Sequence, residues 1–282
     1  VVVVERAVQD EHSPALQSLA FSPAEMRCLC VVIHVPIVLA DRGSARPSLR
    51  GADLLAAVPE DTAVRVAEGT SHGAAHRSTI GRMADYSAPD GAPIWFDLTS
   101  SDPERAVEFY GALFGWEAKA PNPEFAGYRD FTLDGDPIAG LAPHLPEAGG
   151  PADVWNVYLR TDDAQATAAR IVAFGGEEVF PPMVVGDLGV LGYARDSAGA
   201  AVGYWQSGDH PGFRAWGVHG APYWFECHSR DRAQALGFYR DVFGARPEPV
   251  PGAPGGYTQL FYGDTAYAGL MDANALPLPG EV

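Results

Sequence analysis

The chain has 282 residues, 47% of them hydrophobic, and a formal net charge of −17. This length suits a globular protein of about two domains, and the negative charge disfavours nucleic acid as a partner because it repels phosphates. The longest apolar run, residues 29–40, falls short of the roughly 20 residues of a membrane-spanning helix, so we expect no membrane partner. Three cysteines make no disulfide framework, which favours a cytoplasmic location.

The first 82 residues differ in character from the rest. They begin with four valines, show little sustained periodicity and end just before Met83. Lys119 is the one lysine among 19 basic residues, which indicates a GC-rich bacterial genome because arginine has GC-rich codons and lysine does not. We therefore expect residues 1–82 to be a non-native or disordered extension, with Met83 as the natural start.

The first clear structural pattern begins at residue 92. In residues 93–98 apolar side chains alternate with Trp95 and Asp97, which predicts a strand with two distinct faces. Residues 101–104 read Ser-Asp-Pro-Glu, a helix start, and Gly115 can end that helix in a left-handed conformation. Turn residues and strand-like pieces follow, up to about residue 145.

This order of elements recurs along the chain. Residues 221–245 are a near copy of 92–116, and Phe109 and Phe238 correspond at an offset of 129 (238 − 109). A more divergent unit occupies about residues 153–206. The fold class we expect is α+β, built from three βαβββ units, with a linker at 209–220 and a third, truncated unit at 221–282.

The segments DPERAVEFYGALFGW, its copy, and ARDSAGAAVGYWQ resemble the vicinal oxygen chelate superfamily, which includes glyoxalase I, bleomycin-resistance proteins and extradiol dioxygenases. The resemblance covers residues 92–282. It implies that two βαβββ units, about 92–145 and 153–206, form one domain at 83–208 whose mixed sheet curls into an open barrel around a cleft. Residues 221–282 would be the first half of a second such domain. That half could also pair with the same unit of another chain, giving a homodimer.

The resemblance also implies where a metal would be held. Metal-dependent members carry His or Gln in the first strand of a unit and Glu in the last. The corresponding residues here are Trp95 with Gly140 and Asn156 with Gly203, and in the third unit Trp224 with Gly269. Indoles and glycines offer no suitable donor, so we expect no metal and no other cofactor.

Alternation along the strands predicts which side chains line the cleft. If Trp95 faces inward, the same alternation turns four more side chains inward: Asp97, Asn156, Tyr158 and Trp205. Residues 96, 157, 159 and 202 then pack under the helices. Glycines at 140 and 203 are expected to leave open space. The alternative for the tryptophans is that they simply fill the barrel. The ligand-binding set is Trp95, Asp97, Asn156, Tyr158 and Trp205.

Two functions from different classes remain. The first is a metal-free protein of the bleomycin-resistance kind that binds a small aromatic or cationic molecule in the cleft. The second is a lyase or dioxygenase-type enzyme of unknown substrate, with Asp97, or His228 together with Glu226, as the catalytic candidates. The missing metal ligands favour the first.

Overall fold

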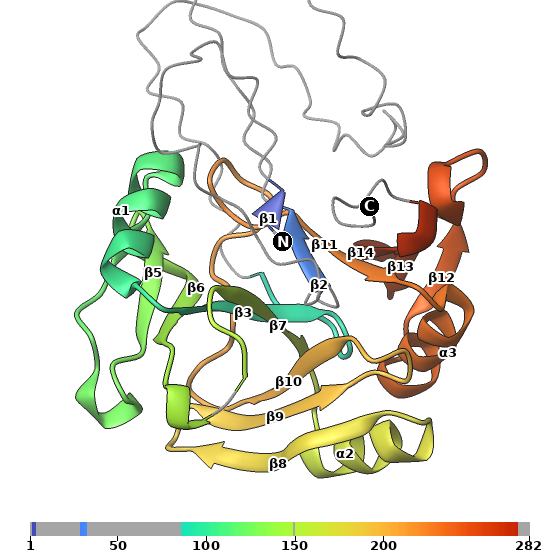
Figure 1. Cartoon of the computed structure of the whole chain (residues 1–282), viewed down its shortest axis with the longest axis horizontal. Helices are drawn as coiled ribbons and strands as arrows, with labels where there is room; N and C mark the ends of the chain where they lie inside the picture. Colours follow the sequence, from blue (N-terminus) through green and yellow to red (C-terminus); the bar gives the residue numbers. More distant parts are fainter. Residues whose placement is uncertain (1, 4–28, 33–85, 149, 276–282) are drawn as a thin grey trace, which may run out of the picture.

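The computed structural model describes residues 2–3, 29–32, 86–148 and 150–275 (Figure 1). Within these ranges the strands form two mixed sheets, neither of which closes on itself. One sheet has eight strands in the order β4-β5-β6-β3-β7-β10-β9-β8, and the other has six in the order β1-β2-β11-β14-β13-β12. The predicted α+β class with open mixed sheets is confirmed.

Each of the three units runs strand, helix, then three strands. The first comprises β3 (Pro93–Ser100), α1 (Pro103–Phe114), β4 (Glu117–Ala118), β5 (Arg129–Leu133) and β6 (Asp136–Pro143). The second comprises β7 (Val154–Arg160), α2 (Ala164–Ala173), β8 (Glu177–Val185), β9 (Gly189–Arg195) and β10 (Ala201–Ser207). The third comprises β11 (Trp224–Ser229), α3 (Arg232–Phe243), β12 (Arg246–Pro249), β13 (Thr258–Tyr262) and β14 (Thr265–Asp272). Short 3-10 turns lie at Pro123–Phe125, Pro146–Ala148, Pro254–Gly256 and Ala273–Ala275.

The helix ends in the duplicated units are set by the same residue types. Asp102 caps α1 by accepting a hydrogen bond from the backbone N of Arg105, and Asp231 caps α3 in the same way. Gly115 and Gly244 follow these helices at φ values of 74° and 71°, a left-handed conformation that glycine adopts without strain. The helix start predicted at residues 101–104 and the stop predicted at Gly115 are confirmed, with Asp102 as the capping residue.

The pairing of β3 with β7 joins the first two units. These strands are antiparallel, and each also pairs in parallel with the last strand of its own unit, β6 or β10. In this register Asp97 lies opposite both Asn156 of β7 and Gly140 of β6. Tyr158 lies opposite Gly203 of β10. The junction thus brings together residues that are far apart in the sequence.

Beneath the helices lies the apolar face of the eight-stranded sheet. Phe96 is fully buried and contacts Trp155, with 4.9 Å between the ring centroids, and Trp155 in turn donates a hydrogen bond to Tyr110 of α1. Burying one such aromatic side chain contributes about 1.5–3 kcal/mol. The four residues predicted to pack on this face are all buried: Phe96, Val157, Leu159 and Val202.

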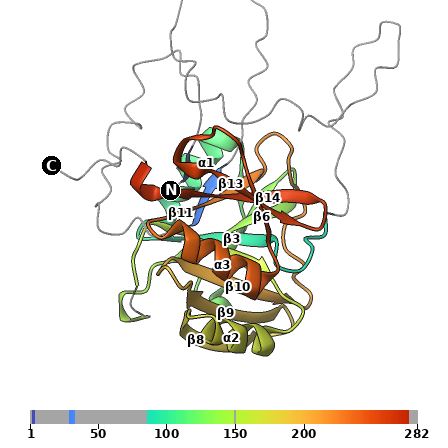
Figure 2. The same cartoon turned by 90° about the vertical axis from the view of Figure 1, so that its right-hand side faces the viewer.

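The segment between the second and third units, residues 209–220, is packed against both sheets. Phe213 contacts Phe96 of β3 and stacks on Phe225 of β11, with centroid distances of 5.7 and 5.9 Å. The indole of Trp116 donates a 2.7 Å hydrogen bond to the carbonyl of Gly220. Helices α2 and α3 also meet, with α3 above α2 in Figure 2. Arg170 of α2 donates a hydrogen bond to the carbonyl of Val242 of α3. This connection fixes the third unit against the first two.

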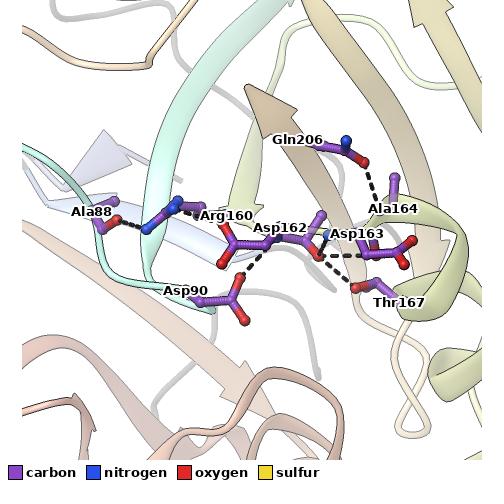
Figure 3. A network of polar contacts seen from close by, with 9 residues as sticks. Ala88, Asp90, Arg160, Asp162, Asp163, Ala164, Thr167 and Gln206 are labelled. Atoms are coloured by element: carbon purple, nitrogen blue, oxygen red, sulfur yellow. Dashed lines mark hydrogen bonds and ion pairs between the residues drawn. The ribbon is translucent and has the colours of Figure 1, made fainter. Parts of the chain in front are cut away.

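A polar network holds the start of the domain against the second unit (Figure 3). Arg160, at the end of β7, donates to the carbonyl of Ala88 at 2.8 Å and pairs with Asp162. The backbone N of Asp162 donates to Asp90. Gln206 of β10 accepts from the first residue of α2. The network therefore ties residues 88–90, β7, α2 and β10 together.

Two short strands come from the N-terminal region. β2 (Leu29–Val32) pairs antiparallel with β11, and β1 (Val2–Val3) pairs parallel with β2. The remaining residues up to 85 lie outside the described part, so the expectation of a non-native extension stays a prediction. Among the described residues, no helix has the length and apolar character needed to cross a membrane.

Candidate functional site

Polar side chains gather on the β3–β7 junction, on the face opposite the helices. Asn156 donates one hydrogen bond to Asp97 at 2.9 Å and another to Thr99 at 3.1 Å. Its carbonyl oxygen accepts a 2.6 Å bond from the hydroxyl of Tyr193 of β9, and Tyr158 hydrogen-bonds to Asp97. We call these five residues the Asp97 cluster: Asp97, Thr99, Asn156, Tyr158 and Tyr193.

Asp97 is the ionisable group at the centre of the cluster. It is 8% exposed, and this burial raises the pKa of its carboxyl from 3.8 to about 6 against the opposing hydrogen bonds from Asn156 and Tyr158. Burial also raises the pKa of Tyr158 well above its usual value, so its hydroxyl stays protonated. Asp97 therefore changes charge just below neutral pH, which is uncommon for a carboxyl group.

Tyrosine rings fill the space beside the two glycines. A Cβ on Gly140 would lie 1.8 Å from Tyr128 Oη, and one on Gly203 would lie 2.1 Å from the ring of Tyr158. The hydroxyl of Tyr128 also accepts a 2.8 Å hydrogen bond from the indole of Trp95. The expectation of open space at these glycines is wrong, because alternation predicts the facing direction of a residue but not which ring from another strand occupies the volume beside it.

The residues at the four ligand positions do not fit a metal ion. The two first-strand positions hold an indole and an amide that already bonds Asp97 and Thr99, and the glycine positions have no room for a glutamate. No group of three or more His, Cys, Asp or Glu side chains with metal-ligand spacing occurs within residues 86–148 and 150–275. These four positions therefore offer a divalent cation no suitable side-chain ligand.

His210 lies against Trp95 and Trp205 and was not predicted from the sequence. Its ring meets that of Trp95 edge-on at 4.4 Å and that of Trp205 at 5.7 Å, while its carbonyl accepts from the indole of Trp205. The backbone N of Gly212 donates to its Nδ1, so the neutral ring carries its proton on Nε2. Burial lowers the pKa of His210. It stands in the irregular stretch SGDHPGF, where no periodicity indicates a facing direction.

The two tryptophans of the predicted ligand-binding set are largely enclosed. Trp95 and Trp205 are 5% and 9% exposed, and His210, Phe213 and Tyr128 surround the indole of Trp95. This packing favours the alternative that they fill the interior. Asn156 remains half-buried.

An apolar hollow of about 360 Å³ lies on β8, lined by Phe180, Pro181, Pro182 and Met183. Phe180 stacks on Tyr193 with 5.7 Å between the centroids and 11° between the planes. Because Tyr193 is bonded to Asn156, a continuous path of contacts runs from the hollow to Asp97. The hollow itself is lined only by these residues of β8 and by no member of the Asp97 cluster.

The other two catalytic candidates lie in the six-stranded sheet. His228 and Glu226 contact each other at 3.0 Å on β11. The structure therefore brings these two together but places them on a different sheet from Asp97.

Comparisons with known proteins agree with this architecture. The sequence model described as Glyoxalase/Bleomycin resistance protein/Dioxygenase superfamily matches residues 92–204. The protein CFP32 of Mycobacterium tuberculosis, whose name assigns it to the glyoxylases, is 35% identical over 195 residues, which cover 67% of this chain and 73% of that protein. The chain therefore belongs to the glyoxalase/bleomycin resistance/dioxygenase superfamily.

Two further proteins illustrate the range of relatives. The anthracycline biosynthesis protein DnrV of Streptomyces peucetius is 36% identical over 197 residues, covering 64% of this chain and 71% of that protein. The Mn(II)-bound glyoxalase from Novosphingobium aromaticivorans superposes with a TM-score of 0.50 at 16% identity, covering 66% of this chain and 62% of that one. At this identity the likeness is one of fold.

Proposed function

We propose that the chain binds a flat aromatic molecule carrying a cationic group, without a metal ion or other cofactor, at the Asp97 cluster and the hollow on β8. The observation that carries this proposal is the buried carboxylate of Asp97, which is linked by hydrogen bonds through Asn156 to Tyr193 and by ring stacking from Tyr193 to Phe180. An ionised carboxylate with little access to water attracts an ammonium group strongly. The apolar rim formed by Phe180 and Met183 suits the flat part of such a molecule.

The relatives suggest a probe for this site. DnrV is named for anthracycline biosynthesis, and anthracyclines are flat fused-ring compounds, several with an amino sugar. Doxorubicin carries this amine and its aglycone lacks it, so the pair separates the charge from the ring system. We expect saturable quenching of doxorubicin fluorescence by the chain, and binding of the aglycone weaker by about tenfold, which corresponds to about 1.4 kcal/mol.

A matched variant assigns the effect to Asp97. Asp97→Asn keeps the size of the side chain and one acceptor oxygen, replaces the other oxygen by an amide donor, and removes the charge. It should bring the affinity for doxorubicin down to that for the aglycone while leaving the aglycone unaffected. Equal loss for both ligands would show that the charge of Asp97 plays no part.

The metal-free state has a test of its own. The chain is purified without chelator, its metal content is measured by plasma mass spectrometry, and it is then titrated with Ni²⁺, Zn²⁺, Fe²⁺ and Mn²⁺. We expect well below one metal per chain. Near-stoichiometric metal would overturn the assignment of Trp95, Gly140, Asn156 and Gly203 to the ligand positions.

One observation favours the second candidate, an enzyme. The pKa of Asp97, at about 6, suits a general base at neutral pH. Because CFP32 is named as a glyoxylase, the hemithioacetal of methylglyoxal and glutathione is the substrate to test. Turnover by the chain that disappears in Asp97→Asn would favour catalysis over binding alone.

A further inference from the structure

The segment after β10, residues 208–214, forms a strap across the eight-stranded sheet. At its start, residues 208–210 donate backbone hydrogen bonds of 2.8, 2.9 and 3.1 Å to carbonyls of residues 187–188, in the turn between β8 and β9. At its end, residues 213–214 donate bonds of 3.0 Å to carbonyls of β3 and β6. The strap therefore links the second unit to the first by its backbone.

Midway along the strap, His210 covers two indoles of the sheet. The centroid of its ring lies 4.4 Å from that of Trp95 on β3 and 5.7 Å from that of Trp205 on β10. Trp95 precedes Asp97 by two positions on β3, so both lie on the face opposite the helices. The strap thus encloses the part of this face that Trp95 and Trp205 occupy.

The closed strap contains a hydrogen bond that requires a neutral imidazole. The backbone N of Gly212 donates to Nδ1 of His210 at 3.0 Å, and a protonated Nδ1 has no lone pair to accept this bond. Protonation would set two N–H groups against each other. Because Gly212 is buried, its N–H would be left without a partner, which destabilises the closed form.

The charges around His210 do not offset this loss. Burial lowers the pKa of His210; Asp130 of β5 acts to raise it, and Lys119 and Arg214 act to lower it. Asp130 is itself paired with Lys119 at 2.8 Å. An imidazolium at this place is therefore disfavoured while the strap is closed.

We propose that residues 208–214 are a pH-sensitive strap, which is closed while His210 is neutral and is released when His210 is protonated, uncovering Trp95 and Trp205. The proton comes from water and forms an N–H bond with the lone pair of Nδ1, so only hydrogen bonds break within the chain. The release needs no ligand, so it is independent of the binding proposed above.

Hydrogen exchange of the strap amides tests the release. Every backbone N–H group of residues 208–214 donates a hydrogen bond, Pro211 having none, so exchange of these amides reports on closure. The full-length chain is exchanged at about pH 7.5 and about pH 5, and each rate is divided by that of the unfolded chain at the same pH. We expect protection of the strap to fall about tenfold or more at the lower pH, while the amides of β3 and β7 keep theirs. Unchanged protection of the strap, or an equal loss in β3 and β7, would overturn the proposal.

Two variants at His210 separate the acceptor from the ring. His210→Asn offers an oxygen acceptor near the place of Nδ1 but does not titrate, and His210→Phe keeps a ring against the indoles but has no acceptor. Both should lose the pH dependence of strap protection. Asp97→Asn should keep it, because Asp97 titrates over the same range without taking part in the strap. A pH dependence that survives in His210→Phe, or disappears in Asp97→Asn, would refute the role of His210.

Gly212→Ala provides a strap that cannot close. Gly212 has a φ of 94°, and a Cβ there would lie 2.4 Å from the carbonyl oxygen of Ile94, which is part of the backbone of β3. We expect low strap protection in this variant at both pH values. Protection equal to that of the unaltered chain would contradict the close seating of the strap on β3.

Acrylamide quenching of tryptophan fluorescence tests the uncovering itself. The quenching constant should be larger at about pH 5 than at about pH 7.5 in the unaltered chain, and large at both in Gly212→Ala. It should not change with pH in His210→Asn. A constant that is independent of pH in the unaltered chain would overturn the uncovering of Trp95 and Trp205.

Discussion

The hydroxyl of Tyr128, held at 2.8 Å by the indole of Trp95, occupies the volume that a side chain on Gly140 would need. Replacing Gly140 by alanine would place its Cβ 1.8 Å from that oxygen and 2.8 Å from Asp97 Cβ. Overpacking of this kind typically costs about 1–3 kcal/mol. We expect Gly140→Ala to lower the free energy of unfolding, measured in urea, by this amount.

Gly237→Ala is the matched control for Gly140→Ala. Apart from its two chain neighbours and the backbone of its own helix, no atom lies within 4 Å of a Cβ built on Gly237, which is inside α3. Alanine there should be neutral or stabilise by roughly 0.5–1 kcal/mol. If Gly140→Ala were as stable as the unaltered chain, the close packing of Tyr128 would be disproved.

Asp97 should make stability depend on pH. Its pKa is raised from 3.8 to about 6 in the folded state, so the folded chain holds this proton more tightly than the unfolded chain does. The resulting stability is fully present below about pH 4 and is lost as pH rises through about 6. A shift of about two units corresponds to about 3 kcal/mol. Urea unfolding at several pH values should show the free energy of unfolding of Asp97→Asn rising relative to that of the unaltered chain as pH increases from about 4 to above 6. A difference between the two chains that stays constant with pH would contradict the raised pKa of Asp97.

The affinity for a cationic ligand should also depend on the ionisation of Asp97, but it should rise with pH over the range where the stability of the fold decreases. The ammonium group of doxorubicin is attracted by the ionised carboxylate of Asp97, so its affinity should rise as pH increases through about 6. Fluorescence titrations of doxorubicin at a series of pH values would measure this. The aglycone and the Asp97→Asn variant should both give flat profiles, and a rise in either would point to another ionising group.

His210 should have the reverse effect on stability. Burial lowers its pKa in the folded state, so the unfolded chain binds this proton more readily and stability is lost as pH falls below about 6.5. Asp97 acts in the opposite direction over part of the same range, so the comparison must be made with a variant. We expect the advantage of the unaltered chain over His210→Gln to shrink on acidification. An unchanging difference between about pH 7 and pH 5 would argue against a buried, neutral His210.

The edge of β11 bears on the predicted homodimer. β2 pairs with β11 antiparallel, as β7 pairs with β3, and so it occupies the edge that the same unit of another chain would use. Deleting residues 1–82 should free this edge and increase the fraction of dimer. Size-exclusion chromatography with light scattering, applied to both lengths of chain, would measure this. Two strictly monomeric samples would rule out pairing through the third unit.

Much of the fold could be predicted because its signals are local. The helix start at residues 101–104, the left-handed Gly115 and the alternation around Phe96 each depend on a few neighbouring residues. The duplication between residues 92–116 and 221–245 then extended these signals to the third unit. The same alternation correctly placed Asp97 and Asn156 on one face.

The rest of the site depends on contacts between distant segments. Nothing near Gly140 in the sequence indicates that Tyr128 fills the space beside it. His210 lies in an irregular loop and meets Trp95 only because the chain turns back after β10. The hydrogen bond between Tyr193 and Asn156 likewise required the order of strands in the sheet.

The bond from Asn156 to Asp97 crosses from one βαβββ unit to the next. Neither unit alone holds the complete cluster, so the site exists only while β3 and β7 are paired. A molecule bound there contacts both units at once and adds its binding free energy to their association. Occupancy of the site would therefore slow the separation of the two units, so that protection of the β3–β7 amides from hydrogen exchange would report on the ligand.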